Sequence, residues 1–120
     1  MECIKQKYRG DCSVASLAMF LNISYEEIII INYKAEVDKE FKDGVWNDKT
    51  FQVSELYGKK LYCYYTDFDL TKPSLLIVPS LNYIGKEHII YWDGKNVYDP
   101  SLSKCYSELP NNILYIFQCE

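Results

Sequence analysis

The chain has 120 residues, of which 48% are hydrophobic and 25% charged, which fits one globular domain with a core of useful size and excludes a disordered chain. Its formal net charge of −4 argues against nucleic-acid binding, because phosphate recognition needs a basic face that this sequence does not supply. The amino terminus has no signal-like apolar stretch and no apolar run is long enough to cross a bilayer, so we expect a cytoplasmic protein without a membrane partner.

Helical patterns dominate the amino-terminal half of the chain. Apolar residues recur at helical spacing over residues 12–21, which predicts a helix with Cys12 at its amino end. The sequence Ser24-Tyr25-Glu26-Glu27 has the form of a capping box and predicts a second helix that runs to roughly Lys34. The four consecutive isoleucines of this segment are also compatible with a strand, and only the capping box favours the helix.

The sequence then passes through a polar segment to a third helix. Residues 36–43 are polar and are expected to form solvated surface. Apolar and aromatic residues over 50–57 predict a short helix, and Gly58 is expected to end it because glycine accepts the left-handed backbone found at helix ends. From Lys60 onward, β-branched and aromatic residues favour strands.

Strands are predicted in the carboxy-terminal half at residues 61–65, 74–78, 88–92, 96–98 and 113–118. Pro79 is expected to end the second of them. The turn Asp93-Gly94-Lys95 is typical of a tight hairpin and joins the third strand to the fourth. Helices followed by strands define the α+β class, so we predict one domain over residues 1–120 with amino-terminal helices packed on an antiparallel sheet.

The cysteines and the single histidine limit metal and redox chemistry. Five cysteines are an odd number at irregular spacings, which favours free thiols in a reducing compartment over a disulfide framework. The sequence has no Cys-x-x-Cys pair, and one histidine is too few for the usual structural zinc sites. We therefore expect no metal ion and no other cofactor.

Four residue types stand in an order that favours nucleophilic catalysis. Cys12 lies at a helix amino terminus, where the positive end of the backbone dipoles favours the reactive thiolate. His88 is the only histidine and can act as its base. Asp99 ends the partner strand of the same hairpin, so it is expected beside His88 and able to orient the ring. Gln6, brought back by a turn at Gly10, and the backbone N–H of Cys12 could donate hydrogen bonds to a developing oxyanion.

The same residues also have ordinary structural interpretations. Cys12 could be a small buried hydrophobe, and His88 an exposed residue at a strand end. Asp99 fits a simple turn, and Gln6 a solvated loop. Trp46 precedes the third helix and could line a substrate cleft or simply the surface. The remaining thiols have no basic partner and are expected to be packing or surface groups: Cys3, Cys63, Cys105 and Cys119.

The sequence around the expected nucleophile resembles a known family. QKYRGDCSVASLAMFL, with Gln6 and Cys12, is similar to the opening of papain-like cysteine peptidases, and most similar to the bacteriocin-processing double-glycine peptidase family. The second and third helices of that family resemble LNISYEEI and GVWNDKTFQVSELYGKKL of this chain. The strand before the family's histidine resembles KPSLLIV, and its histidine strand, turn and Asp-Pro resemble HIIYWDGKNVYDPS. The resemblance covers residues 6–101 and implies a papain-like fold with nucleophile Cys12, base His88, orienting acid Asp99 and oxyanion donor Gln6. A serine follows the nucleophile where glycine is usual, and the hairpin is shorter.

Two functions from different classes are compatible with these residues. The first is a cysteine-dependent hydrolase in which Cys12 attacks an amide carbonyl, an acyl-enzyme forms and water releases the product. The bond can belong to a peptide, an isopeptide or a glutamine side chain, because all three reactions use the same residues. The alternative is a catalytically silent papain-fold module that binds a partner protein in its cleft. We expect a monomer that takes a peptide or protein substrate.

Overall fold

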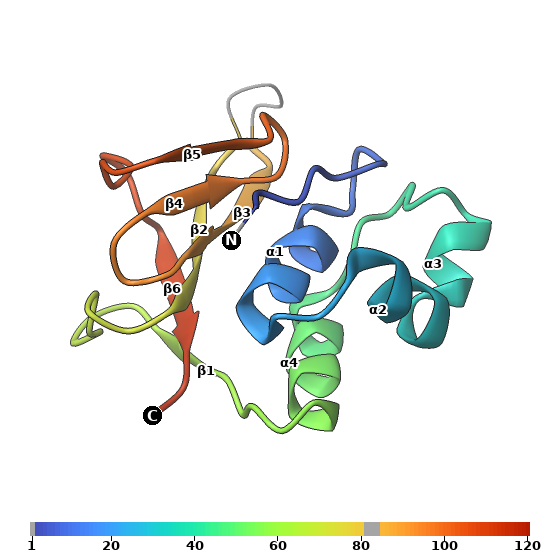
Figure 1. The fold of residues 1–120 in the computed structure, drawn as a ribbon, viewed down its shortest axis with the longest axis horizontal. Helices are drawn as coiled ribbons and strands as arrows, with labels where there is room; N and C mark the ends of the chain where they lie inside the picture. Colours follow the sequence, from blue (N-terminus) through green and yellow to red (C-terminus); the bar gives the residue numbers. More distant parts are fainter. Residues whose placement is uncertain (1, 81–84) are drawn as a thin grey trace.

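The computed structural model describes residues 2–80 and 85–120, and in this part of the chain the helices precede the strands (Figure 1). The helices are α1 (Cys12–Leu21), α2 (Tyr25–Asn32), α3 (Lys34–Asp38) and α4 (Asn47–Leu56). The strands are β1 (Tyr62–Tyr64), β2 (Ser74–Pro79), β3 (Glu87–Trp92), β4 (Val97–Asp99), β5 (Lys104–Tyr106) and β6 (Tyr115–Gln118). This arrangement confirms the α+β class.

The strands form one antiparallel sheet in the order β1-β6-β2-β3-β4-β5. β2 and β3 pair along their whole length, whereas β4 is short and pairs with β3 only at Tyr91 and Trp92. In the described part of the sheet, the first half of β3 therefore has no strand on its β4 side. α1 supplies a partner there instead, because the Ser16 hydroxyl donates a hydrogen bond of 2.9 Å to the carbonyl of Ile89.

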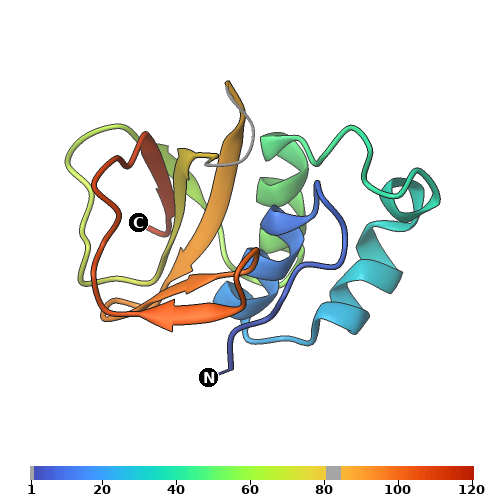
Figure 2. The same ribbon diagram turned by 90° about the horizontal axis from the view of Figure 1, so that it is seen from above.

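The helices cover one face of the sheet, and loops cover the other (Figure 2). α1 is the central helix, and every residue from Ser13 to Phe20 is buried. Alternate strand residues share its core, which includes Val14, Leu17, Ala18, Leu75, Ile77, Ile89, Tyr91 and Phe117. The opposite face of the sheet holds a second core made of Leu76, Val78, Ile90, Trp92, Val97 and Ile116. The period-two alternation of the strands thus separates two apolar layers.

The helix predictions are confirmed for the most periodic segments and fail for the polar one. The first helix spans the predicted residues 12–21. The second begins as predicted, with Ser24 Oγ accepting the N–H of Glu27 at 3.0 Å, but it ends at Asn32 instead of Lys34. The polar segment 36–43 is not simply solvated surface, since it overlaps α3 and buries Phe41 to 2% exposure.

Strand and helix ends also differ from the prediction. α4 begins three residues early, at Asn47, and ends at Leu56. Pro79 is the last residue of β2 and pairs with Glu87, since a proline is tolerated at a strand end. β6 starts only at Tyr115, two residues later than predicted. β5 was not predicted, because its three residues are all exposed and have no apolar alternation.

No single helix in residues 2–80 and 85–120 has both the length and the apolar character of a membrane span. Among the helices that the structure describes, only α1 and α2 taken together reach the length and apolar composition of a span, and these two helices are bent by 116° relative to one another.

The hydrogen bond from α1 to β3 can be tested with two serines of one helix. Ser16→Ala is expected to lower the free energy of unfolding by about 1–3 kcal/mol, because it leaves the buried Ile89 carbonyl without its donor. Ser13→Ala is the matched control, since this hydroxyl is also buried but has no hydrogen-bond partner among the described residues. Removing it should change stability little or raise it. If urea unfolding shows the same loss of unfolding free energy for Ser16→Ala and Ser13→Ala, the stabilising role of the Ser16 hydrogen bond is contradicted.

Candidate active site

Cys12 begins α1 and follows a turn that is folded around a buried carboxylate. Asp11 is fully buried, and its side chain accepts hydrogen bonds from the backbone N–H groups of Lys7 and Tyr8, each at 3.1 Å. The hydroxyl of Tyr25 in α2 donates to the same carboxylate. Asp11 therefore fixes the segment that leads into the thiol. No local pattern in the sequence predicts this role of Asp11, and its position directly before Cys12 is the one available signal.

The same turn packs closely against the segment that follows α3. A Cβ atom on Gly10 would lie 2.4 Å from the carbonyl oxygen of Phe41 and 2.9 Å from Cα of Gly44. Any side chain at this position would force the two segments apart. Gly10 is thus required for a close approach between segments, and not only for the sharp turn that the sequence predicts.

His88 and Asp99 meet across the β3–β4 hairpin, as the hairpin pattern predicts. His88 Nε2 lies 2.8 Å from Asp99 Oδ1, and both side chains are mostly buried. The Cys12 thiol is close enough to the same imidazole to raise the pKa of His88. Because Asp99 occupies Nε2, Nδ1 is the ring nitrogen that remains for the sulfur. The structure therefore brings together three of the four predicted site residues.

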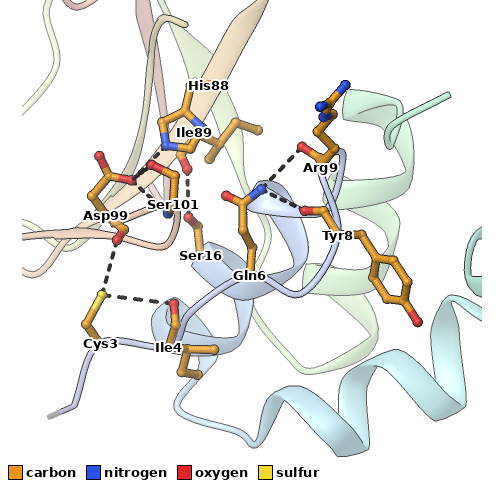
Figure 3. Close-up of polar contacts among 10 residues, drawn as sticks. All are labelled: Cys3, Ile4, Gln6, Tyr8, Arg9, Ser16, His88, Ile89, Asp99 and Ser101. Atoms are coloured by element: carbon orange, nitrogen blue, oxygen red, sulfur yellow. Dashed lines mark hydrogen bonds and ion pairs between the residues drawn. The ribbon is translucent and has the colours of Figure 1, made fainter. Parts of the chain in front are cut away.

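Asp99 is held by contacts from its own turn and from the amino-terminal segment (Figure 3). The backbone N–H and the hydroxyl of Ser101 both donate to Asp99 Oδ1, at 3.0 and 2.8 Å. Cys3 Sγ donates to the backbone carbonyl of Asp99 at 3.4 Å. The backbone N–H of Gln6 donates to the carbonyl of Pro100 at 3.0 Å. The orientation of the acid is therefore fixed independently of the histidine.

Charges within the site favour a protonated imidazole. Burial lowers the pKa of His88, but the hydrogen bonds to Asp99 and Cys12 outweigh it and raise the pKa to about 9. Burial also opposes ionisation of Asp99, yet the hydrogen bonds from His88 and Ser101 leave its pKa below the ordinary value. At neutral pH the ring and the carboxylate therefore form an ion pair.

Gln6 lies near this group, but its amide is not directed at it. The side-chain nitrogen donates to the carbonyls of Tyr8 and Arg9, at 2.8 and 3.2 Å, on the side away from His88 (Figure 3). Turning the amide over would place its oxygen against these two carbonyl oxygens. The amide oxygen is buried and has no partner among the described residues. The role of Gln6 as an oxyanion donor therefore remains a prediction that requires its side chain to rotate.

A second donor is available at the start of α1. Within residues 2–80 and 85–120, the backbone N–H of Cys12 has no acceptor, as is usual in the first turn of a helix. Such N–H groups point along the helix axis and bind anions. An oxyanion formed by attack of Cys12 can therefore be stabilised at this position without Gln6.

The other thiols lie in different surroundings, and all five cysteines are free. Burial, followed by the charge of Asp99, raises the pKa of Cys3 to about 11. Burial also raises the pKa of Cys63. These two thiols therefore stay protonated at neutral pH and are expected to react slowly, because the thiolate is the reactive form.

Two cavities in the described part of the chain are lined by neither the Cys12 thiol nor the His88 imidazole. One measures about 460 Å³, and its lining includes Phe20, Lys59, Lys60, Tyr62 and Lys72. The other, about 360 Å³, is lined by residues 2–5, by Lys7 and by residues 24–26. Neither contains any of Cys12, His88 or Asp99. Comparison of the chain with family models, curated proteins and solved structures gives no match.

The raised pKa of His88 can be measured without ambiguity, because the chain has one histidine. We expect its ring proton resonances to titrate in NMR with a midpoint near pH 9. Asp99→Asn should lower the midpoint by at least about one pH unit, since the neutral amide no longer stabilises the imidazolium. Cys12→Ala should also lower it. The control Asp67→Asn changes an exposed carboxylate elsewhere and should have no effect. A wild-type midpoint near 6.5 would contradict the arrangement.

The same shift predicts how stability depends on pH. The pKa of His88 is higher in the folded chain than its ordinary value of about 6.5, so protonated His88 stabilises the fold fully below about pH 6.5. This contribution is lost as the pH rises through about 9 and is expected to be roughly 1–3 kcal/mol. This contribution is measured by urea unfolding of the wild type and of His88→Gln, once below about pH 6.5 and once above about pH 9. The difference between the two proteins should shrink at high pH.

Proposed function

We propose that the chain is a papain-like thiol hydrolase that cleaves an amide bond, with Cys12 as nucleophile, His88 as acid and base, and Asp99 as the orienting carboxylate. One observation carries this proposal: His88 is bonded to the buried carboxylate of Asp99, and the Cys12 thiol at the amino terminus of α1 is close enough to raise the pKa of the same ring. Nucleophilic catalysis by cysteine needs these three groups in this order. A papain-like fold is supported by an amino-terminal helix that carries the thiol and an antiparallel sheet that carries the imidazole.

The proposed reaction begins from a Cys12 thiolate beside protonated His88. The thiolate adds to the carbonyl carbon, and the carbonyl π electrons move onto oxygen, where the N–H of Cys12 can donate. The intermediate collapses with cleavage of the C–N bond, and the leaving nitrogen takes the proton from the imidazolium. Water then loses a proton to His88 and adds to the acyl carbon. The C–S bond breaks, the acid departs, and the sulfur is a thiolate again.

Asp99 acts on this sequence through the imidazolium. Its carboxylate keeps the ring oriented and stabilises the positive charge that His88 carries beside the Cys12 thiolate. A peptide, an isopeptide and a glutamine side-chain amide remain equally compatible with these three residues. The substrate is therefore proposed to be a peptide or protein, and the bond is left among these three amides.

A catalytically silent module that binds a partner protein is the second candidate, and the orientation of Gln6 favours it. Both N–H groups of that amide are used by backbone carbonyls, so the side-chain donor proposed for the oxyanion is occupied. A silent module would retain the fold and the Cys12/His88 contact without turnover. The two candidates differ in the reactivity of the thiol.

Competitive alkylation distinguishes the two candidates. With a small amount of iodoacetamide near neutral pH, Cys12 is expected to react at least about tenfold faster than the other four cysteines, as measured by peptide mass spectrometry. His88→Ala should remove this difference, and Asp99→Asn should reduce it. Cys105→Ser, which removes an exposed thiol in β5, serves as the control and should leave it unchanged.

Turnover is tested separately with fluorogenic peptides and with protein substrates trapped on Cys12→Ser. Hydrolysis that is lost in Cys12→Ala supports the hydrolase. Equal alkylation of all five thiols, together with no turnover, would favour the silent module.

A further inference from the structure

One segment, residues 44–47, lies between the turn that precedes Cys12 and the sheet at Tyr115. Its first residue, Gly44, lies against Gly10, which is two residues before Cys12. Its last residue, Asn47, starts α4 and donates from Nδ2 to the hydroxyl of Tyr115 at 3.5 Å. The segment between these two anchors contains Trp46. The tryptophan is therefore attached on one side to the turn before the nucleophile and on the other side to the sheet.

Tyr115, which binds Asn47, also contacts the residue that precedes His88. The Tyr115 hydroxyl donates to the carboxylate of Glu87, and Glu87 immediately precedes His88 in β3. Tyr65 packs against Tyr115 with ring centroids 5.3 Å apart. We call Trp46, Tyr65, Glu87 and Tyr115 the aromatic-acidic cluster.

The cluster exposes large aromatic surface beside a carboxylate. Trp46 is 82% exposed and Tyr65 70%, whereas the other tryptophan, Trp92, is 6% exposed. Glu87 is exposed, and among the described residues no lysine or arginine forms a salt bridge with it. A carboxylate next to open aromatic rings attracts a cation that has an apolar stem, through the charge and through the ring faces.

The geometry also limits which part of a substrate can reach the cluster. Successive side chains of a strand point to opposite faces, so Glu87 diverges from His88 although the two are neighbours in sequence. A group bound at Glu87 is therefore displaced from the attacked carbonyl. A side chain held there therefore belongs to a residue beside the scissile bond and not to the attacked amide itself.

We infer that the aromatic-acidic cluster is a subsite for a lysine or arginine side chain of the substrate, close to the bond that Cys12 attacks. This inference rests on the proposed hydrolase function and adds a substrate class to it: basic peptide segments. The ammonium or guanidinium meets the Glu87 carboxylate, and the aliphatic stem lies along Trp46 and Tyr65. The negative net charge of the chain acts in the same direction over longer distances.

Three matched probes test the subsite. Short peptide vinyl sulfones are made identical except for lysine, norleucine or glutamate at one of the two residues nearest the electrophile, and the rate of Cys12 labelling is followed by mass spectrometry. The lysine probe is expected to react about fivefold faster than the norleucine probe in the wild type. The ratio should fall by about threefold in Glu87→Gln and by a similar factor in Trp46→Ala.

Two further variants separate the charge of Glu87 from a general effect of removing a surface carboxylate. Glu87→Lys should shift the preference toward the glutamate probe. The control Glu55→Gln changes an exposed glutamate at the far end of α4 and should leave the ratio at its wild-type value.

Two failures have different meanings. If Cys12 is labelled selectively but all three probes react at equal rates, the subsite is overturned and the hydrolase proposal stands. If no probe labels Cys12 in preference to the other thiols, the hydrolase proposal falls and the subsite falls with it.

Discussion

The contact between α1 and the first half of β3 is the constraint on which the site depends. β4 stops short of this part of β3, so the carbonyl of Ile89 is free to accept from Ser16. Cys12 lies one helical turn before Ser16, and His88 lies one strand residue before Ile89. One helical turn rises 5.4 Å and one strand residue about 3.3 Å, so Cys12 and His88 are both only a few ångströms from the hydrogen bond at Ser16. This bond therefore helps to hold the thiol near the imidazole. A longer β4 would compete with α1 for the same edge.

Two buried carboxylates fix the loops on either side of this contact. Asp11 gathers two backbone N–H groups and the hydroxyl of Tyr25, and thereby shapes the turn before the thiol. Asp99 gathers the N–H and hydroxyl of Ser101 as well as the His88 ring. A buried carboxylate with several donors is costly to leave unpaired, so each loop has a single favoured conformation. Cys12 and His88 are thus each positioned by a neighbouring buried carboxylate that accepts several hydrogen bonds.

The parts of the fold that follow from local patterns were predictable from the sequence. α1 has a long apolar pattern, and the Asp93-Gly94 turn sets the hairpin that brings His88 to Asp99. α3 and β5 were missed because one is a five-residue polar helix and the other a wholly exposed strand, so neither has a periodic apolar face. The function, the nucleophilic role of Cys12 and the finer fold remain proposals, since no local pattern measures reactivity.

The orientation of Gln6 shows where sequence reasoning reaches its limit. It is set by the carbonyls of Tyr8 and Arg9, and these are placed by the Asp11 carboxylate, whose partner Tyr25 lies 14 residues further along the chain. An oxyanion would compete with those two carbonyls for the same amide. Hydrogen bonds to a charged acceptor are roughly twice as strong as those to a neutral one, so the developing charge favours rotation of the amide toward the substrate. The turn held by Asp11 need not unfold for this, because only the Gln6 side chain has to move.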